Sequence, residues 1–186
     1  MFESVKLPEG FEIRFEPLDP SLRSAERGSL ELEAERRLVE TAFADGVTLR
    51  HRADGSPVAD GLGKEISVTH CKDYIAVAAY GDRRFGIDLE HLRTRALQTV
   101  ATRFLSPREK RIYTTPFDWL IAWTMKEAIY KAVGIVGLGY AESIYLPRKR
   151  TSPAIAEVRT KDVTRRFKLY FGREDDLALT VALPID

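Results

Sequence analysis

The chain has 186 residues, of which 44% are hydrophobic and 31% are charged. This composition predicts one compact domain, or two small halves that share a core, and argues against a disordered chain. The formal net charge is only +1, so the chain lacks the strong positive field that marks many nucleic-acid binders. The single cysteine, Cys71, excludes a disulfide framework and a thiolate zinc cluster within one chain.

The sequence predicts no contact with a membrane. It contains no run of about 18 to 20 apolar residues, the length that a membrane-spanning helix needs. Residues 1–4 do not begin a secretory signal or an amphipathic transit segment. We therefore expect a cytoplasmic protein, which agrees with the sparse use of cysteine.

The first half of the sequence predicts strands around one long helix. Apolar and polar residues alternate from residue 11, and apolar residues then recur at helical spacing until Asp45-Gly46 ends the run. Residues 54–57 combine Gly and Pro in a turn, and polar residues 70–73 separate two apolar runs as in a hairpin. We expect a helix at 21–43 and strands at 11–15, 66–69, 74–80 and 85–90.

The second half repeats this order in outline. Ser106 is a good N-cap, Pro107 suits the first helical position, and Glu109 is placed to complete a capping box. We expect helices at 96–104, 107–113 and 118–133, and strands near 144 and 158 and at 167–171 and 178–183. The two halves share an order of elements without visible sequence identity.

Two carboxylates stand on the strand predicted at 85–90. Asp88 and Glu90 are two residues apart, so their side chains point to one face while Ile87 and Leu89 point to the other. Carboxylates held this close repel each other unless a cation lies between them, and Mg²⁺ prefers such oxygen ligands. The alternative is a solvated strand face with no ligand.

The helix predicted at 118–133 carries a third carboxylate. Trp123, Glu127 and Lys131 fall at i, i+4 and i+8 on one face, opposite an apolar stripe. The pair Glu127 and Lys131 is explained either by an ordinary helix ion pair or by a site in which Glu127 joins Asp88 and Glu90. A metal ion beside a lysine suits phosphate chemistry.

A basic stretch covers residues 93–111. Its only acidic residue is Glu109, and its cations are Arg93, Arg95, Arg103, Arg108, Lys110 and Arg111. The stretch is either a solvated helix face or a local patch that attracts an acidic partner.

The two acidic motifs together resemble the paired signature of the 4′-phosphopantetheinyl transferases. The family patterns are approximately G-x-D-x-E, matched by residues 86–90, and W-[SCT]-x-K-E-[AS]-x-x-K, matched by residues 123–131. Arg103-Phe104-Leu105-Ser106 with Glu109 lies between them, and Gly55-Ser56-Pro57 and Ser67-Val68-Thr69-His70 precede them. The resemblance covers roughly residues 50–140.

The resemblance implies an α+β fold of two pseudo-symmetric halves, each a small antiparallel sheet packed with helices. Residues 1–85 would form the coenzyme A-binding half and residues 86–186 the half with the metal and catalytic motifs, with the active site between them. The length is similar to that of the larger members, which are monomers in which two copies of the fold are fused. The implied reaction transfers 4′-phosphopantetheine from coenzyme A to a serine of an acyl or peptidyl carrier protein and releases adenosine 3′,5′-bisphosphate.

The resemblance also implies roles for the acidic residues. Asp88, Glu90 and Glu127 would hold Mg²⁺ against the pyrophosphate of coenzyme A, and Lys131 would contact the same pyrophosphate. Asp88, Glu127 and Lys131 would thus be catalytic. Either Glu127 or a water on the ion would accept the proton of the carrier serine.

Coenzyme A contacts are implied at five further positions, Arg27, Gly55, Pro57, Thr69 and His70. The sequence departs from the family pattern nearby, because Ser56 stands where a lysine is usual and Cys71 where a serine is usual. One contact to a phosphate or to adenine is therefore in doubt. Carrier proteins usually present an acidic helix, which the basic stretch at 93–111 would meet.

Two other functions fit parts of the sequence. A catalytically inactive module that binds coenzyme A or a carrier protein would share the fold, but the presence of all three carboxylates and Lys131 argues against it. A different Mg²⁺-dependent phosphotransferase would need another phosphate motif. The sequence has neither a P-loop nor a kinase His-Arg-Asp motif.

Overall fold

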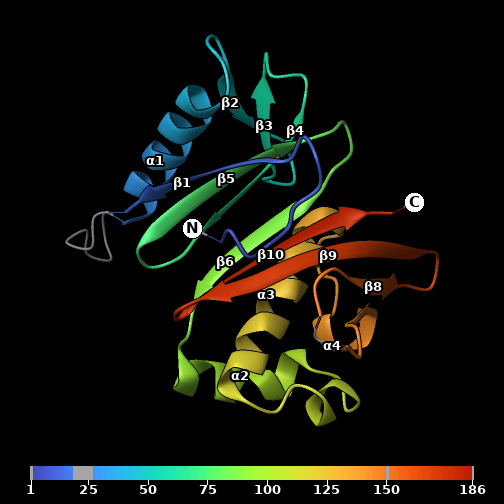
Figure 1. Ribbon diagram of the computed structural model, residues 1–186. Coiled ribbons are helices and arrows are strands. Elements are labelled where there is room, and N and C mark those ends of the chain that lie inside the picture. Colours follow the sequence, from blue (N-terminus) through green and yellow to red (C-terminus); the bar gives the residue numbers. More distant parts are fainter. Residues whose placement is uncertain (1, 19–26, 150, 186) are drawn as a thin grey trace. The chain divides into compact units, whose positions relative to one another are not determined.

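The computed structural model describes residues 2–18, 27–149 and 151–185. The chain divides into two units (Figure 1). We call Pro8–Arg84 the N-terminal unit, and we call Phe85–Asp186 together with Met1–Leu7 the C-terminal unit. No helix in the described ranges is long and apolar enough to cross a membrane.

The N-terminal unit is built on a three-stranded antiparallel sheet in the order β1-β5-β4. The central strand β5 is an apolar run whose residues 75–79 are all buried, as expected for a strand covered on both faces. Helix α1 contributes Leu38 and Val39 to the core, which also contains Ile75 and Val77. The elements are β1 (Glu12–Pro17), α1 (Arg27–Ala42), β2 (Thr48–His51), β3 (Pro57–Asp60), β4 (Glu65–His70) and β5 (Tyr74–Tyr80), with β2 and β3 forming a separate hairpin.

The C-terminal unit contains a five-stranded antiparallel sheet in the order β6-β10-β9-β8-β7. Helix α3 packs on β6, β10 and β9 (Figure 1). The strands are β6 (Gly86–His91), β7 (Ile144–Tyr145), β8 (Ala154–Arg159), β9 (Thr164–Glu174) and β10 (Leu177–Pro184). The helices are α2 (Thr94–Phe104), the 3₁₀ helix η1 (Glu109–Arg111), α3 (Pro116–Val133) and α4 (Tyr140–Ser143).

Helix α3 has clear start and stop signals. Thr115 and Asp118 form a reciprocal capping box with Pro116 at the first helical position, and Gly134 ends the helix in the left-handed conformation with φ of 66°. Leu120 and Met125 lie in the interior, where they are fully buried. The helix is therefore enclosed on most sides, and it fixes the polar side chains that it carries.

The first residues of the chain belong to the C-terminal unit. Phe2 and Val5 are buried, and the backbone N–H of Phe2 donates to the carboxylate of Glu174 at the end of β9. A side chain at Gly172 would meet Val5 at 2.7 Å, so this strand leaves room for the N-terminal segment. The C-terminal unit is thus assembled from two separate parts of the sequence.

The two units share a strand topology. In each unit the first strand pairs antiparallel with the last strand, which pairs with the strand preceding it, giving β1-β5-β4 and β6-β10-β9. A helix follows the first strand in both. The α+β class with antiparallel sheets and packed helices is as predicted.

Most predicted elements are present, but the helix predicted at 107–113 is wrong in length. Ser106 and Glu109 form the predicted capping contacts, yet only the three-residue η1 follows them. The turn ends there because the N–H groups of Thr114 and Thr115 both donate to Asp118, the cap of α3. Strands β2 and β3 and helix α4 were not predicted because they are short, and residues 21–26 of the predicted first helix lie outside the described part.

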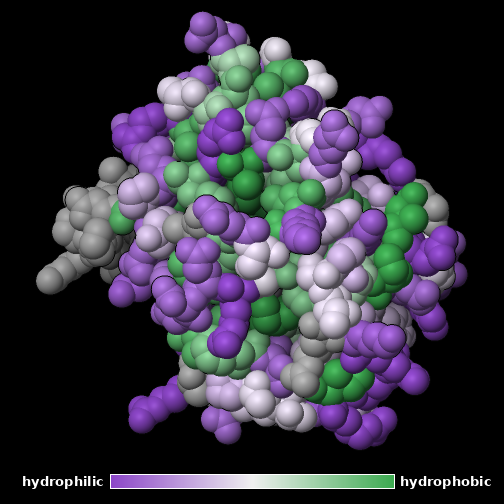
Figure 2. Space-filling model, viewed as in Figure 1, coloured by the Kyte–Doolittle hydropathy of each residue, from purple (hydrophilic) through white to green (hydrophobic). Residues whose placement is uncertain are grey.

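The described surface of each unit mixes hydrophilic and apolar residues, as the face shown in Figure 2 illustrates. The large apolar residues that are exposed come from separate elements and loops: Leu32, Val136, Ile155, Val163 and Ile185. Single exposed apolar residues are ordinary in folded proteins and do not mark a binding surface.

Candidate active site

A close approach of β6 to α3 organises the acidic residues. A Cβ atom at Gly86 would lie 2.0 Å from the carbonyl oxygen of Ala128 and 2.9 Å from the backbone nitrogen of Ala132. Only glycine allows the strand to lie this close to the helix. Gly86, Asp88 and Glu90 alternate on one face of the strand, so both carboxylates are on the side of α3.

Asp88 is joined directly to α3. Its Oδ1 accepts a hydrogen bond of 2.9 Å from the Nζ of Lys131, which also donates to the carbonyl oxygen of Ile87 at 2.9 Å. The side chain of Asp88 is only 10% exposed, whereas that of Lys131 is 30% exposed. The predicted lysine therefore lies beside the first predicted metal ligand, and it makes an ion pair with it.

Glu127 is held by a residue that the sequence did not identify. The hydroxyl of Tyr140 donates to Oε1 of Glu127 at 2.9 Å. Burial and the negative charge of Asp88 raise the pKa of Glu127, with a smaller contribution from Glu90, while Tyr140 and Lys131 act in the opposite direction. Burial and the charge of Glu127 raise the pKa of the Tyr140 phenol, so it remains a hydrogen-bond donor.

Glu90 has partners of its own. Its Oε1 accepts from the backbone N–H of His91 at 2.9 Å and lies 3.3 Å from the guanidinium of Arg93. Across residues 2–18, 27–149 and 151–185, no three His, Cys, Asp or Glu side chains are close enough together to hold a metal ion. The structure therefore brings Asp88, Glu90 and Glu127 to facing elements with each carboxylate engaged in a separate contact.

The chemistry of these three residues nevertheless fits a hard divalent cation. All are carboxylates, which supply only oxygen ligands. Burial is the main cause of the raised pKa of Glu127, and the charges of Asp88 and, to a smaller extent, Glu90 add to it, so a cation held beside Glu127 would favour its charged form.

Lys126, the residue before Glu127 on α3, belongs to a buried ion pair. Lys126 is fully buried, and its Nζ donates to Glu109 Oε2 at 2.8 Å and to the carbonyl oxygens of Tyr140 at 2.7 Å and Ile144 at 2.8 Å. One sequence signal pointed to it, because Lys126 shares a helix face with apolar Ala122, Ile129 and Val133 at i−4, i+3 and i+7. A lysine on such a face needs a buried partner.

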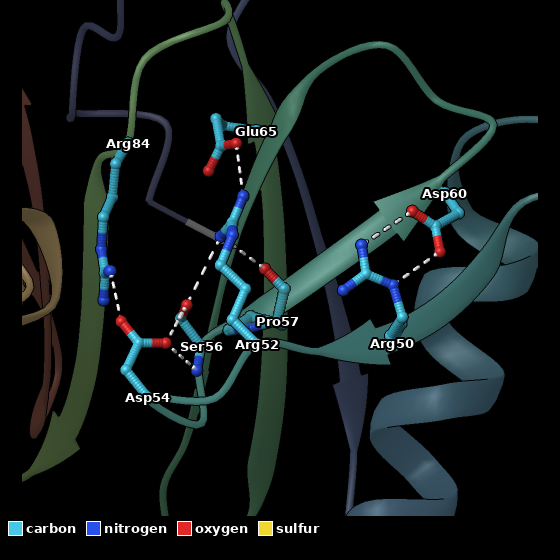
Figure 3. A network of polar contacts seen from close by, with 8 residues as sticks. All are labelled: Arg50, Arg52, Asp54, Ser56, Pro57, Asp60, Glu65 and Arg84. Atoms are coloured by element: carbon cyan, nitrogen blue, oxygen red, sulfur yellow. Dashed lines mark hydrogen bonds and ion pairs between the residues drawn. The ribbon is translucent and has the colours of Figure 1, made fainter.

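In the N-terminal unit, Gly55 lies in the turn that joins β2 to β3, and Pro57 is the first residue of β3. Figure 3 shows the polar contacts around this turn. Asp54 accepts hydrogen bonds from both the hydroxyl and the N–H of Ser56, and it forms an ion pair with Arg84 at 2.7 Å. These contacts hold the pKa of Asp54 below its usual range. Gly55 has φ of +81°, which favours glycine. Ser56, which replaces the usual lysine, is thus part of the turn.

This turn is attached to the start of β4. Arg52 donates to the carbonyl oxygen of Pro57 at 3.3 Å and to Glu65 at 2.7 Å (Figure 3). Thr69 and His70 lie at the opposite end of β4, roughly 13 to 17 Å from Glu65 at the usual rise of a strand. The predicted coenzyme A residues of this unit therefore form two groups separated by one strand length.

The remaining residues predicted to bind coenzyme A differ in exposure. Thr69 is buried, whereas His70 is exposed and its Nε2 lies 3.4 Å from a carboxylate oxygen of Glu31 in α1. Arg27 is the first residue of α1, and its side chain lies outside the described part of the structure.

A cavity of about 1070 Å³ in the C-terminal unit has a strongly basic lining. The cations that line it include Arg108, Arg111, Arg148, Lys149 and Arg159, against the carboxylates of Glu142 and Glu157. Arg159 is already paired with Glu157. None of Asp88, Glu90 and Glu127 lines this cavity, so its volume does not identify the acidic site.

Comparisons with known proteins bear on the same part of the chain. Residues 84–182, just over half of the sequence, match the family model of the 4'-phosphopantetheinyl transferase superfamily. Over 99 residues, or 50% of the chain, the sequence is 34% identical to the 4'-phosphopantetheinyl transferase HetI of Nostoc sp. (strain PCC 7120). This alignment covers 41% of that relative, so the chain matches less than half of the relative's length.

The segment that matches the family model includes both β6 and α3. It therefore contains the glycine that sets their spacing and all four residues of the acidic site, Asp88, Glu90, Glu127 and Lys131. The sequence signature, the α+β fold and the family match agree, and the chain belongs to the 4′-phosphopantetheinyl transferase superfamily.

Proposed function

We propose that the protein transfers the 4′-phosphopantetheine group of coenzyme A to a serine of an acyl or peptidyl carrier protein. One observation carries the proposal. The contact of Gly86 with α3 places Asp88 and Glu90 on the side of Glu127 and Lys131, within the segment that matches the family. This arrangement supports the proposal that the two acidic motifs, far apart in sequence, act as one site.

The proposed reaction is a displacement at phosphorus. The serine oxygen bonds to the phosphorus that carries pantetheine, and the bond from that phosphorus to the bridging oxygen of the pyrophosphate breaks. The bridging oxygen leaves with adenosine 3′,5′-bisphosphate. The serine proton passes to Glu127 or to water, and both remain candidate acceptors.

Asp88, Glu90 and Glu127 would hold Mg²⁺ in this site. When bound, the ion offsets the charge of the pyrophosphate and of the departing bisphosphate. Lys131 adds a positive charge beside Asp88, on the exposed side of their ion pair. The charges of Asp88 and Glu90, which add to the effect of burial in raising the pKa of Glu127, support this assignment, because a cation would favour the charged form of that carboxylate.

The coenzyme A contacts are proposed at Gly55, Pro57, Thr69 and His70, with Arg27 as a further candidate and with Lys131 on the pyrophosphate. The separation of the first four into two groups at opposite ends of β4 suits an elongated ligand such as a nucleotide with a long arm. The proposed active site between two halves of the chain, residues 1–85 and 86–186, stays a prediction.

The basic stretch at 93–111 is the proposed docking surface for the carrier protein. Arg103, Lys110 and Arg111 are exposed, and Arg111 also lines the basic cavity. A local cluster of cations attracts an acidic partner even in a protein of low net charge. Arg93 is less suited to docking because its guanidinium contacts Glu90.

Intact-mass spectrometry tests the proposal directly. The protein is incubated with coenzyme A, Mg²⁺ and each of several apo carrier proteins, and we expect one carrier to gain the mass of a single phosphopantetheine. D88A and E127A should each lose at least about 100-fold in rate, the scale expected when a group that stabilises transition-state charge is removed. The control D162A removes an exposed carboxylate of the same unit and should leave the rate unchanged.

Two outcomes would contradict the proposal. Near-normal rates for D88A and E127A would refute the metal assignment. Binding of coenzyme A without a mass gain in any carrier would favour the alternative, an inactive module that binds coenzyme A or a carrier protein.

A further inference from the structure

The ring of Tyr140 packs against two aromatic residues of α3, one on each side of Glu127 along the helix. Its centroid lies 6.0 Å from that of Trp123 and 5.4 Å from that of Tyr130, in tilted arrangements that are favourable for aromatic pairs. Trp123 and Tyr130 stand at i−4 and i+3 from Glu127, so they lie one turn before and one turn after it. The Tyr140 ring therefore spans the section of helix that carries the carboxylate.

The backbone of Tyr140 is fixed from the same section of helix. Lys126, the residue before Glu127, donates from Nζ to the carbonyl oxygen of Tyr140 at 2.7 Å. The same ammonium group is anchored by Glu109 and by the carbonyl oxygen of Ile144. Adjacent residues of α3 thus hold one tyrosine at two points, because Lys126 binds its backbone and Glu127 accepts from its hydroxyl.

We propose that Tyr140 is a positioning residue that fixes the orientation of the Glu127 carboxylate for metal binding. This inference rests on the proposed function, and it deepens that function by adding a residue outside both sequence motifs. A hydrogen bond to Oε1 restricts rotation of the carboxylate before an ion arrives. Ligating carboxylates that are themselves hydrogen-bonded bind metal more tightly, and losing such a partner typically costs 10- to 100-fold in affinity or activity.

The substitution Y140F removes the hydroxyl and keeps the ring contacts. We expect it to weaken binding of Mn²⁺ alone about 10-fold or more, measured by calorimetric titration without carrier protein or turnover. We also expect kcat to fall by a similar factor while the KM for the carrier protein changes less than about twofold.

Tyr130, the α3 tyrosine whose ring packs on Tyr140, provides a matched control. Its hydroxyl accepts from the N–H of Gly137 at 3.3 Å, and its ring packs on Tyr140, so Y130F removes a phenolic oxygen near the site without removing the bond to Glu127. We expect Y130F to bind Mn²⁺ within about twofold of the unaltered protein. Equal weakening in Y130F and Y140F would overturn the inference.

A double-variant cycle separates positioning from general support of the fold. If Tyr140 acts through Glu127, adding Y140F to E127A should weaken Mn²⁺ binding no further. An equal effect of Y140F in both backgrounds would overturn the inference, as would a fall in melting temperature with unchanged Mn²⁺ affinity.

Different outcomes refute the role of Tyr140 and the proposed function. If the unaltered protein binds Mn²⁺ and modifies a carrier while Y140F behaves identically, only the role of Tyr140 is refuted. If the unaltered protein modifies no carrier, the proposed function is refuted, and the Mn²⁺ titrations still decide whether Tyr140 positions Glu127. If the unaltered protein binds no Mn²⁺, the metal site and the inference are both refuted.

Discussion

The buried pair Lys126 and Glu109 is a residue-scale feature with a direct consequence for stability. Both side chains are almost fully buried, at 0% and 2% exposure, and lie 2.8 Å apart. Burial lowers the pKa of Lys126, and the charge of Glu109 opposes that change. Glu109 Oε2 also accepts from the N–H of Ser106, and Oε1 accepts from the N–H of Leu146, so the carboxylate ties three segments of the chain together.

We expect K126M to lower the free energy of unfolding by about 3 to 5 kcal/mol, because it leaves the Glu109 carboxylate buried without its ammonium partner. The effect is measured from urea unfolding curves, with the slope checked against that of the unaltered protein. K110M is the control, since Lys110 is an exposed lysine beside the same glutamate in η1, and a change within about 0.5 kcal/mol is expected. A loss below about 1 kcal/mol for K126M would show that the pair is dispensable.

The acidic site could be predicted at the residue scale only in part. Asp88, Glu90, Glu127 and Lys131 stand out because carboxylates and a lysine at strand and helix spacing have a specific chemistry. Tyr140 could not be found in this way, since it lies nine residues beyond Lys131, and its position depends on how the loop after Gly134 folds back. The burial of Lys126 is indicated by the apolar residues on its helix face, but its partner Glu109 is not, because that contact depends on how η1 packs against α3.

At the scale of elements, the fit of β6 against α3 determines whether the two motifs can meet. The strand lies so close to the helix that the backbone atoms of Ala128 and Ala132 occupy the space a side chain at residue 86 would need. Asp88 follows two residues later and reaches Lys131 across the same interface. A small outward shift of the strand would therefore break the contact of Asp88 with α3.

We expect G86A to destabilise the protein by at least about 1 to 3 kcal/mol, the range for overpacked interiors, because the added Cβ meets helix backbone that cannot rotate away. Transferase activity should fall more than the loss of folded protein explains, since Asp88 moves with the strand. Calorimetric melting and single-carrier kinetics on the folded fraction measure the two effects.

G139A is the matched control for this substitution. A Cβ at Gly139 would meet the carboxylate end of Glu142 at 2.5 Å, and a flexible side chain can move aside. Similar behaviour of G86A and G139A would contradict the proposed spacing role.

The sequence predicts an element more reliably when the element is long and has clear start and stop signals. Helix α3 and strand β5 were evident because each has a long apolar pattern, and α3 also has a strong cap. Strands β2 and β3 are only four residues long, too short for a periodic pattern, so their hairpin depends on the Asp54 turn and on contacts such as Arg50 with Asp60. Residues 107–113 begin with a valid helix start signal, but the helix ends early because Thr114 and Thr115 donate to Asp118 at the start of α3.

At the scale of the whole molecule, charge is nearly balanced in total and uneven in position. The net charge is +1, yet the stretch 93–111 carries six cations and one glutamate, which is buried. Electrostatic attraction is therefore local, and it acts on a partner that approaches this surface of the C-terminal unit.

We expect the double reversal R103E/K110E to raise the KM for a carrier protein about 10-fold, equivalent to about 1.4 kcal/mol, while the KM for coenzyme A changes less than twofold. Steady-state kinetics with each substrate varied in turn measure both values. K161E reverses an exposed lysine in the turn between β8 and β9 and should change neither. Equal increases in both KM values for R103E/K110E would refute the docking surface.

The place of the first residues in the C-terminal unit affects how the chain folds during synthesis. All strands of the N-terminal unit are present once residue 84 has been synthesised. Phe2, by contrast, can form its hydrogen bond to Glu174 only after a further 172 residues of the chain have been synthesised. At ordinary rates of translation this delay is on the order of 10 to 30 s, during which the apolar side chains of Phe2 and Val5 remain uncovered. A fragment that begins at residue 85 would lack these two side chains, so residues 85–186 alone do not contain the whole C-terminal unit.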